Sequence, residues 1–401
     1  MKVGILRENK IPTDKRVPLT PEQCAEIQQK FPNVSITVQP SKIRCFSDVE
    51  YRLNGITVGE DVNDCDVLLG VKEVQVGDFI PGKTYFFFSH TIKKQEYNRN
   101  LLKTVLKKRI QLVDYETLTD KNGFRILGFG RFAGLVGAYN GLRAFGLRIH
   151  LFNLKPAYLC SDINEMLGQL ETIQLPPIKI AVTGDGRVAG GVVEIMKYMA
   201  LMKVSPAEYI SRTYPVPIYT QLLPQNYVRR KDFAAFDLIH FFNYPDMYEN
   251  AFLPFSKTTD LLIAAAYWDP KAPVLFTHED MKENDFRIRV ISDITCDIEG
   301  SIPSTKKAST IDDPFYDYNP ETGELEPAFS SHENITVQAI DNLPCELPKD
   351  ASEDFGRNLI NNVFPALFGK DTEGIIERAS ITKNGKLTQR FSYLQDFADG
   401  R

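Results

Sequence analysis

The residues of this chain that could do chemistry follow short apolar segments. Lys72 and Glu73 come directly after VLLGV, His90 follows TYFFFS, and Asp114 and Glu116 follow IQLV. In open α/β sheets, ligands bind beyond the carboxyl ends of the strands, so we expect these side chains to share one edge of a sheet. A lysine or histidine there can transfer protons when burial and neighbouring charges adjust its pKa.

Two further groups could bind an anionic substrate or act beside it. Arg16 precedes the segment VPL, and a guanidinium binds a carboxylate through two parallel hydrogen bonds. Arg16, Lys72 and His90 together would therefore suit an anionic substrate and proton transfer. Asp293 and Asp297 follow a second apolar segment, IRVIS. Each of these residues taken alone is also compatible with an exposed charge at a strand end or a structural histidine.

Residues 178–202, IKIAVTGDGRVAGGVVEIMKYMALM, indicate a different chemistry. An apolar run is followed by a glycine turn and then by apolar residues at helical spacing, which forms a G-x-G-x-x-A dinucleotide fingerprint. Gly184 permits the tight turn, Gly186 lets the backbone approach a pyrophosphate, and Ala189 lets the helix pack against the strand. The free N–H groups at the helix start suit phosphates. A glycine-rich turn without a ligand is the alternative, and the flanking strand and helix favour the dinucleotide.

The acid that usually binds the ribose of NAD is missing. The next apolar strand, 216–222, ends with Gln221 where many dinucleotide-binding units carry Asp or Glu. No carboxylate occurs between Glu208 and Asp232, and the basic stretch Arg229–Lys231 lies just before Asp232. A basic stretch without an acid suits a 2′-phosphate, so we expect NADP(H), with NAD(H) as the alternative.

Composition excludes several classes of protein. The chain has 401 residues, a net charge of -5 and a sequence pI near 5.7, which argues against a nucleic acid or an anionic membrane as its partner. Its start lacks the long apolar region of a signal peptide, and no apolar run approaches the length of a membrane span. The six cysteines show no C-x-x-C spacing. We therefore expect a cytoplasmic protein with reduced thiols and no structural metal.

The elements that must position these residues alternate between strand and helix. Before the glycine turn we expect strands at 2–7, 34–38, 67–71, 84–88 and 110–113, with helices at 21–30 and 96–106. A helix at 132–148 links this part to the dinucleotide unit, whose further strands we expect at 216–222, 237–242, 261–265 and 288–294. A long polar loop at 304–331, a strand at 335–340 and a helix at 351–368 follow. This order predicts an α/β protein with parallel sheets that carry helices on both faces.

Several segments resemble the lysine–2-oxoglutarate reductase domain of the aminoadipic semialdehyde synthase family. The longest is residues 85–137, which begin YFFFSHTIK and end RFAGLVG. The others are RVPLTP, GVKE, AYWD, SDITCDIEGSI, TIDDPFY and AIDNLPCELPKDA. They are collinear with that domain over nearly the whole chain. The wider group includes fungal saccharopine dehydrogenase (lysine-forming), alanine dehydrogenase and the soluble domain of transhydrogenase.

The resemblance implies two Rossmann-like domains with parallel sheets. A cofactor domain, expected at 133–329, is inserted into a discontinuous substrate domain, expected at 1–132 plus 330–401. In this group the substrate lies facing the nicotinamide.

The resemblance also implies roles for single residues. Lys72 in GVKE and His90 in FSHTIK match the active-site lysine and histidine, so they are expected to form the acid–base pair. Arg16 in RVPLTP matches the arginine that holds a keto-acid carboxylate. Further substrate-binding positions are matched by Lys93, Glu116 and Arg125, and a carboxylate near the nicotinamide by Asp297.

For the cofactor, Gly184 and Gly186 match the glycine turn of the family. Gln221 departs from the aspartate of the NAD-dependent fungal enzymes, and Asp185 inside the turn is a second departure, which Arg187 could offset. The residues expected to bind the cofactor are Gly184, Gly186, Arg187, Val188, Ala189, Gln221, Arg229 and Arg230.

The implied activity is the condensation of L-lysine with 2-oxoglutarate and reduction of the imine by NAD(P)H to saccharopine. The alternatives are an activity like that of alanine dehydrogenase, another opine-type amino-acid dehydrogenase, and a dinucleotide-binding sensor without catalysis. Lysine and 2-oxoglutarate are the expected small-molecule partners, and the oligomeric state is left open.

Overall fold

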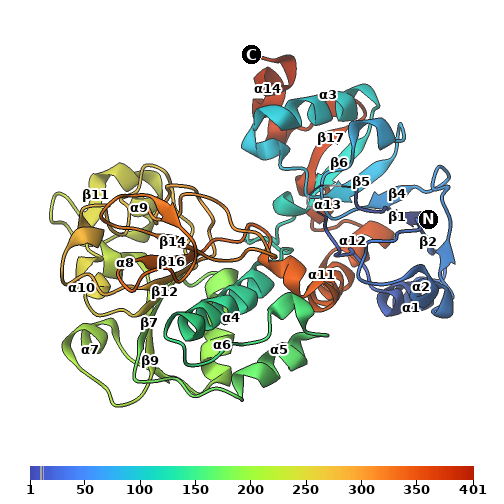
Figure 1. Cartoon of the computed structure of the whole chain (residues 1–401). Helices are drawn as coiled ribbons and strands as arrows, with labels where there is room; N and C mark the ends of the chain where they lie inside the picture. Colours follow the sequence, from blue (N-terminus) through green and yellow to red (C-terminus); the bar gives the residue numbers. More distant parts are fainter. Residues whose placement is uncertain (10, 12) are drawn as a thin grey trace. The chain divides into compact units, whose positions relative to one another are not determined.

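The computed structural model describes residues 1–9, 11 and 13–401, which form two compact units (Figure 1). One unit combines Met1–Phe129 with Pro348–Arg401, and the other is Gly130–Leu347. The first unit is therefore discontinuous in sequence, and the second is inserted into it. Each unit contains one eight-stranded, mostly parallel sheet, so the α/β fold class predicted from the sequence is confirmed.

The sheet of the first unit has the strand order β18-β17-β6-β5-β4-β1-β2-β3. Its parallel strands are β1 (Lys2–Ile5), β2 (Ser35–Val38), β3 (Thr57–Val58), β4 (Val67–Leu69), β5 (Thr84–Phe87) and β6 (Gln111–Asp114). The antiparallel strands β17 (Ser380–Lys383) and β18 (Lys386–Leu387) extend it beyond β6.

Helices cover both faces of this sheet. Phe86 and Phe88 pack into the core beneath α1 and α11, whereas Tyr85 and Phe87 pack into the core beneath α3 and α14. This alternation follows the two-residue repeat of a strand that is buried on both sides. The helices of the unit are α1 (Pro21–Lys30), α2 (Asp48–Leu53), α3 (Arg99–Lys107), α11 (Pro348–Asn362), α12 (Phe364–Phe368), α13 (Ile375–Ala379) and α14 (Gln395–Asp399).

Residues near the helix ends in the sequence explain where these helices begin and end. Thr20 caps α1 by accepting a hydrogen bond from the backbone of Gln23, and Pro21 occupies the first turn, as the sequence predicts. The single helix expected at 351–368 is instead two helices, α11 and α12. Pro365 lies in the first turn of α12, where its missing N–H group costs no helical hydrogen bond, so the break falls just before it.

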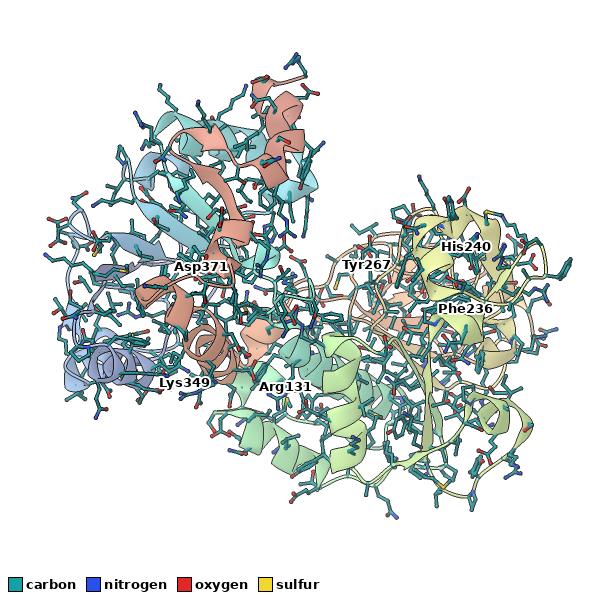
Figure 2. The ribbon with its side chains drawn as sticks, turned by 180° about the vertical axis from the view of Figure 1, so that it is seen from behind. Arg131, Phe236, His240, Tyr267, Lys349 and Asp371 are labelled. Carbon is teal, nitrogen blue, oxygen red and sulfur yellow. The ribbon has the colours of Figure 1, made fainter. Side chains whose placement is uncertain are left out.

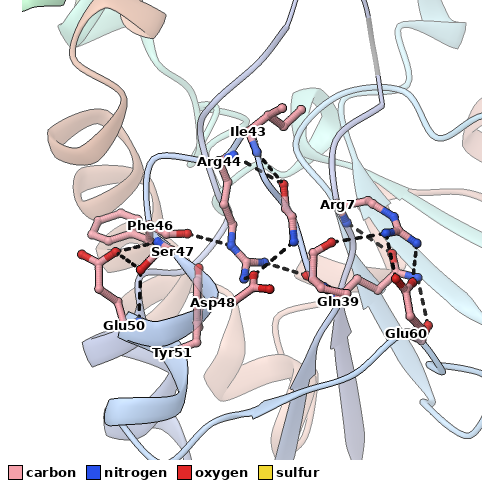
Figure 3. Close-up of polar contacts among 12 residues, drawn as sticks. Arg7, Gln39, Ile43, Arg44, Phe46, Ser47, Asp48, Glu50, Tyr51 and Glu60 are labelled. Carbon is pink, nitrogen blue, oxygen red and sulfur yellow. Dashed lines mark hydrogen bonds and ion pairs between the residues drawn. The ribbon is translucent and has the colours of Figure 1, made fainter.

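Arg44 organises the segment that connects β2 to α2 (Figure 3). Its guanidinium donates to the carbonyl oxygens of Gln39 at 2.7 Å and Phe46 at 2.8 Å, and it forms an ion pair with Asp48. It also lies 4.5 Å from the ring centre of Tyr51, which is fully buried. One cation therefore satisfies two carbonyl groups and closes this side of the core.

The sheet of the second unit has the order β15-β14-β16-β13-β12-β7-β9-β8. Its parallel strands are β7 (Lys179–Thr183), β8 (Met202–Lys203), β9 (Ile218–Leu222), β12 (Leu261–Ala264), β13 (Val290–Asp293) and β16 (Ile335–Gln338). The strands β14 (Tyr316–Tyr318) and β15 (Leu325–Glu326) are antiparallel, and β10 (Val228–Arg230) and β11 (Tyr248–Asn250) form a separate ribbon.

Two helices of this unit touch backbone to backbone. A Cβ atom at Gly134 in α4 would lie 1.9 Å from the carbonyl oxygen of Val188, and one at Gly191 in α6 would lie 2.1 Å from that of Arg131. The small residues of α4 are therefore required for this contact. The helices of the unit are α4 (Gly130–Arg148), α5 (Ile163–Leu170), α6 (Arg187–Tyr198), α7 (Pro206–Ser211), α8 (Pro224–Tyr227), α9 (Leu238–Asn243) and α10 (Leu253–Ser256).

Three features of the second unit differ from the expectation. Residues 237–242 were expected as a strand, but they contain α9, because Asp237 caps the amide of His240 at 2.7 Å and starts a helix. The expected loop 304–331 contains β14 and β15. The strand β16 pairs with β13 in this unit, so the chain returns to the first unit at Pro348 and not at 330. An apolar run is compatible with a strand in either sheet, and only its hydrogen-bonded pairing shows to which sheet it belongs.

Neither a membrane-crossing helix nor a metal cluster is present in the described part of the chain. None of its helices is both long and apolar enough to cross a membrane. Nowhere among these residues do three His, Cys, Asp or Glu side chains gather as metal ligands would. The six cysteines are all free thiols.

A buried carboxyl group makes the stability of the second unit depend on pH. Burial raises the pKa of Glu346 to about 7, although Asn140 donates a hydrogen bond to it at 2.7 Å and Arg143 is near. The pKa in the unfolded chain is lower, so stability that is present below that lower pKa is lost as pH rises through about 7. The loss is ~3 kcal/mol at most.

We expect Glu346→Gln to remove this pH dependence, because glutamine keeps an acceptor for Asn140 but carries no charge. Its melting temperature relative to the wild type should be higher at pH 8 than at pH 5.5, measured by scanning calorimetry. Glu324→Gln, at an exposed site, is the control. Equal differences at the two pH values would show that Glu346 does not titrate in this range.

Candidate functional site

The first cluster of predicted residues lies at the carboxyl edge of the first sheet. The strands β4, β5 and β6 are neighbours and parallel, so the residues that follow them emerge at one edge. The strand β1 is also parallel to β4. This topology brings the segments after four strands together, as the sequence pattern predicts.

His90 is held by a carboxylate and an aromatic ring. Its Nδ1 atom lies 2.6 Å from Oε1 of Glu73, and both side chains are mostly buried, with exposed fractions of 17% and 11%. The ring stacks on Phe88, with 16° between the planes. The backbone φ of His90 is 52°, an uncommon value for a residue with a side chain. Because Glu73 engages Nδ1, proton transfer with a substrate would use Nε2.

The backbone before Lys72 is held by Glu8, a residue that the sequence analysis missed. The two carboxylate oxygens of Glu8 accept hydrogen bonds from the amides of Val71 at 2.7 Å and Lys72 at 3.0 Å. Burial raises the pKa of Glu8 to about 7. The signal was available, because Glu8 follows the apolar segment of β1 just as Lys72 follows that of β4.

Arg16 is buried in a tight pair with Asp14. Its Nε and Nη2 atoms donate to the two oxygens of Asp14 at 3.0 and 2.6 Å, and its guanidinium lies 4.0 Å from the ring centre of Phe129. Burial alone would raise the pKa of Asp14, but the charge of Arg16 and its hydrogen bonds hold that pKa well below the usual range. A substrate carboxylate would therefore meet an oriented and partly neutralised guanidinium.

Lys93, Glu116 and Arg125 form a second charged group. Oε1 of Glu116 lies 3.6 Å from Nζ of Lys93 and 3.7 Å from Nη1 of Arg125. Among the described residues, Oε2 of Glu116 has no hydrogen-bond partner, although it is buried. Arg125 also lies over Phe88 at 5.5 Å, and burial lowers its pKa. A polar ligand group would satisfy Oε2.

Four aromatic rings lie beneath these polar groups, and we call them the aromatic floor: Phe88, Tyr115, Phe129 and Phe355. Phe88 contacts the other three at 5.2–6.0 Å between ring centres, and Phe129 stacks on Phe355 at 4.6 Å. His90, Arg125 and Arg16 each pack on a ring of the floor. The floor therefore connects the acid–base candidates with the cationic residues inside one unit.

The two glycines in the turn of the second unit, Gly184 and Gly186, have different roles. Gly184 has φ of +92°, and a Cβ atom there would lie 3.0–3.2 Å from atoms of Ala265 and Ala266, so the fold itself requires glycine. Gly186 is the N-cap residue of α6 and has an ordinary φ of −72°, and a Cβ atom there would meet nothing within 4 Å. The space over Gly186 lies at a helix N-terminus, which is the cradle that a diphosphate requires. The residues present therefore fit a dinucleotide.

The end of β9 places Gln221 at this turn. The strand β9 lies beside β7, and Nε2 of Gln221 donates to the carbonyl oxygen of Gly184 at 2.9 Å. Its Oε1 atom accepts from Nζ of Lys203 at 2.9 Å. Lys203, on the edge strand β8, is thus a cation beside the expected ribose position that the sequence analysis missed. Its strand is too short for a hydrophobic pattern to reveal it.

The basic stretch after β9 is compensated by acids. Arg229 forms an ion pair with Glu249 on the neighbouring strand β11, and Arg230 forms one with Asp232. Nζ of Lys231 donates to the carbonyl oxygen of Asp246. Glu249 lies beyond the segment in which the sequence shows no carboxylate, so the sequence alone could not reveal this pairing. The stretch therefore offers less net charge to a phosphate than its residue types indicate.

Asp297 lies in the second unit, in the turn after β13. Asp293, at the end of that strand, is fully buried and accepts hydrogen bonds from Thr295 and Thr305. A Cβ atom at Gly300 would lie 2.6 Å from Cβ of Asp297, so the turn is tightly folded around Asp297. The remaining predicted cofactor residues, Arg187, Val188 and Ala189, form the first turn of α6.

The chain is similar to several known proteins. Residues 4–136 match the family "alanine dehydrogenase/PNT, N-terminal domain". Alpha-aminoadipic semialdehyde synthase of Arabidopsis thaliana is 29% identical over 98% of this chain and 41% of its own length. The mitochondrial enzyme of the same name from Mus musculus is 29% identical over 100% of this chain and 48% of its own length. The chain thus spans less than half of these relatives.

Shorter relatives and solved structures agree with these matches. The NAD(+), L-lysine-forming saccharopine dehydrogenase of Neurospora crassa is 24% identical over 86% of both chains. An L-alanine dehydrogenase structure has a TM-score of 0.63 at 13% identity, covering 100% of this chain and 99% of that one. A transhydrogenase structure from Sinorhizobium meliloti has a TM-score of 0.60 at 15% identity, covering 97% and 100%. The predicted resemblance is confirmed: along its length the chain is similar to alpha-aminoadipic semialdehyde synthases and to lysine-forming saccharopine dehydrogenases, and it shares the fold of alanine dehydrogenase and transhydrogenase.

Proposed function

We propose that this protein is a saccharopine-forming reductase that joins L-lysine to 2-oxoglutarate. The observation that carries the proposal is one edge of the first sheet, where a histidine oriented by Glu73 and a lysine loop held by Glu8 occur with three cationic side chains. Proton-transfer groups beside cations suit the condensation of an amine with an anionic keto acid. The names of the relatives reported above support this reaction.

Different residues bind the substrates and transfer protons in the proposed reaction. Arg16, Lys93 and Arg125 bind the carboxylates of 2-oxoglutarate, each aligned by a carboxylate partner. Lys72 or Nε2 of His90 removes a proton from the attacking amine, and the same pair donates a proton when the carbinol oxygen leaves as water. The start of α6 at Gly186 would hold the diphosphate of a nicotinamide dinucleotide, and that cofactor would supply the hydride for reduction of the imine. Positioning the two substrates together accounts for much of the acceleration.

The direct test is nicotinamide absorbance with purified protein, lysine and 2-oxoglutarate, run with NADPH and with NADH. Oxidation that requires both substrates supports the proposal. Oxidation with ammonia and pyruvate, without lysine, would indicate the activity of an alanine dehydrogenase instead. Oxidation with a different amine would indicate another opine-type enzyme, and dinucleotide binding without any turnover would indicate a sensor.

We expect NADP(H) to be the better cofactor and Lys203 to contribute most to that preference. The double change Lys203→Ala and Gln221→Asp removes a cation and adds an acid that suits the ribose 2′-hydroxyl of NAD(H) and repels a 2′-phosphate. The ratio of kcat/KM for NADPH to that for NADH should fall tenfold or more, about 1.4 kcal/mol. Steady-state kinetics with both cofactors measures it.

The matched comparison is Arg229→Ala, because Arg229 is already paired with Glu249. In Arg229→Ala, the ratio of kcat/KM for NADPH to that for NADH should change by less than about threefold. A larger effect of Arg229→Ala than of Lys203→Ala would place the phosphate on the basic stretch Arg229–Lys231 instead.

The cytoplasmic location expected from the sequence is part of the proposal. The name of the Mus musculus relative describes that protein as mitochondrial. Cell fractionation with an antibody against this chain distinguishes the two compartments.

A further inference from the structure

Asp114 is a buried carboxylate at the candidate site to which the proposed reaction assigns no role. It is the last residue of β6, and its side chain is fully buried. Burial raises its pKa to about 6, so its negative charge is unfavourable at this position in itself. Ionisable groups with such a raised pKa are frequent at functional sites. The contacts of Asp114 show which group it could serve there.

Asp114 holds the backbone of the segment that follows the neighbouring strand β5. Its Oδ2 atom accepts a hydrogen bond from the backbone N–H of Ser89 at 3.0 Å and another from the hydroxyl group of the same residue. Its Oδ1 atom accepts from the backbone N–H of Glu116 at 2.7 Å. One carboxylate therefore joins the residue before His90 to Glu116, a second residue of the candidate site.

The hydrogen bonds continue to the other side of His90. The hydroxyl oxygens of Ser89 and Thr91 lie 2.8 Å apart, and the backbone N–H of Thr91 donates to the Ser89 hydroxyl at 3.3 Å. Ser89 and Thr91 are both fully buried. The two neighbours of His90 are thus fixed in the interior by a network that ends on Asp114.

This network has a physical task, because the backbone of His90 is strained. Its φ of 52° lies in the left-handed region, which is unfavourable for a residue with a side chain. Such a conformation persists only where the surrounding structure holds it. The bonds between Ser89 and Asp114 hold the preceding residue, and Glu73 holds the ring. If the first hold were lost, the backbone would relax and the ring would turn away from its present direction.

The same arrangement occurs at the loop of Lys72. Glu8 follows β1, and its carboxylate accepts hydrogen bonds from the backbone N–H groups of Val71 and Lys72, which follow the neighbouring strand β4. Asp114 ends β6 and binds the residue after the neighbouring strand β5 in the same way. Each candidate proton-transfer residue therefore has a buried carboxylate on the adjacent strand that fixes its backbone. This recurrence supports a role in positioning.

We propose that Asp114 is a positioning residue for proton transfer by His90. Through Ser89 it fixes the backbone conformation that directs Nε2 of His90 toward the substrate. The inference rests on the proposed reaction, and it adds to that reaction a fully buried residue that acts only through another.

The test is Asp114→Asn, which keeps the size of the side chain and removes its charge. We expect Nδ2 of the asparagine to face Ser89, because a hydroxyl group can accept a hydrogen bond whereas the backbone N–H of Glu116 can only donate. The backbone N–H of Ser89 then loses its acceptor, while the bond from Glu116 remains. The variant therefore releases the segment of His90 selectively.

Asp114→Asn should lower kcat by about 10- to 100-fold and leave the KM for NADPH within about twofold, measured by steady-state kinetics. In the His90→Gln background the same change should lower kcat by less than about threefold, because a positioning residue has little effect once the residue that it positions is gone. An equal loss in the two backgrounds would overturn the proposal, since Asp114 would then act independently of His90.

Asp371→Asn is the matched control for a general loss of stability. Asp371, labelled in Figure 2, accepts hydrogen bonds from three backbone N–H groups at the start of α13, and none of these belongs to a residue of the candidate site. Its melting temperature should fall, but its kcat should stay within about twofold of the wild-type value. If both variants lost kcat to the same extent, reduced stability would explain the effect of Asp114→Asn and the proposal would be wrong.

Hydrogen exchange separates this inference from the proposed reaction, because it needs no substrate. In Asp114→Asn the amides of residues 89–91 should exchange about tenfold faster or more by mass spectrometry, with those of β1 unchanged. If exchange rises there but no amine and keto acid support turnover in the wild type, the hold of Asp114 on the His90 segment stands and the reaction fails. If the wild type turns over and Asp114→Asn changes neither exchange nor kcat, the positioning role fails and the reaction stands.

Discussion

Two single changes, Lys72→Met and His90→Gln, are each expected to lower turnover by about 10²–10⁴-fold. Neither change alters the glycine turn, so the affinity for the dinucleotide should stay within about threefold. The reason is that both side chains occur where β4 and β5 end, and His90 is aligned by Glu73. Stopped-flow measurement of NADPH oxidation gives the turnover, and calorimetry gives the affinity.

The pattern of the single and double changes tests whether the two residues act as a pair. If they share proton transfer, the double variant should be little slower than the slower single variant. Lys94→Met, at an exposed lysine in the same loop, is the matched control and should keep normal turnover. Normal turnover in the double variant would remove both residues from the mechanism.

Gly186→Val is expected to weaken dinucleotide binding by about 100-fold or more, close to 3 kcal/mol, without lowering the melting temperature. The protein itself leaves the space beside Gly186 empty, so the valine side chain is accommodated in the free protein. It would then occupy the volume over the start of α6 that a diphosphate needs. Calorimetric titration with NADPH and a thermal melt of the free protein measure the two quantities.

Gly184→Ala provides the opposite case. Its φ of +92° is unfavourable for alanine, and the added methyl group would press on Ala265 and Ala266. This variant should lose stability by roughly 1–3 kcal/mol and melt at a lower temperature. If Gly186→Val binds NADPH normally, the glycine turn does not hold the diphosphate, whatever Gly184→Ala does.

Carboxylates accompany the cations of the candidate site. Asp14 pairs with Arg16, Glu116 lies near Lys93 and Arg125, and Glu73 bonds His90. The Asp14–Arg16 pair is buried, so removing one partner would leave an uncompensated charge and Asp14 is as necessary as Arg16. The sequence pattern identified the cations because their motifs are distinctive. It gave no reason to pair Asp14 with Arg16 rather than with another cation.

The sequence by itself determined most of the parallel strands, the glycine turn and the residues at the strand ends. These features depend on local patterns: apolar runs, glycine at a positive φ, and polar residues placed just after a strand. They were sufficient to indicate two α/β units and a dinucleotide site. The capped start of α1 belongs to the same class.

Tertiary structure alone decided which strands pair and which charges meet. The sequence of β16 is compatible with a buried strand in either sheet, and only its hydrogen bonds to β13 assign it to the second unit. In the sequence Arg229 has no evident acidic partner, but the pairing of β10 with β11 places Glu249 beside it. Glu8 and Lys203 acquire their roles from β4 and β9, strands distant in sequence. Long-range pairing is a property of the whole fold, so no local window of sequence contains it.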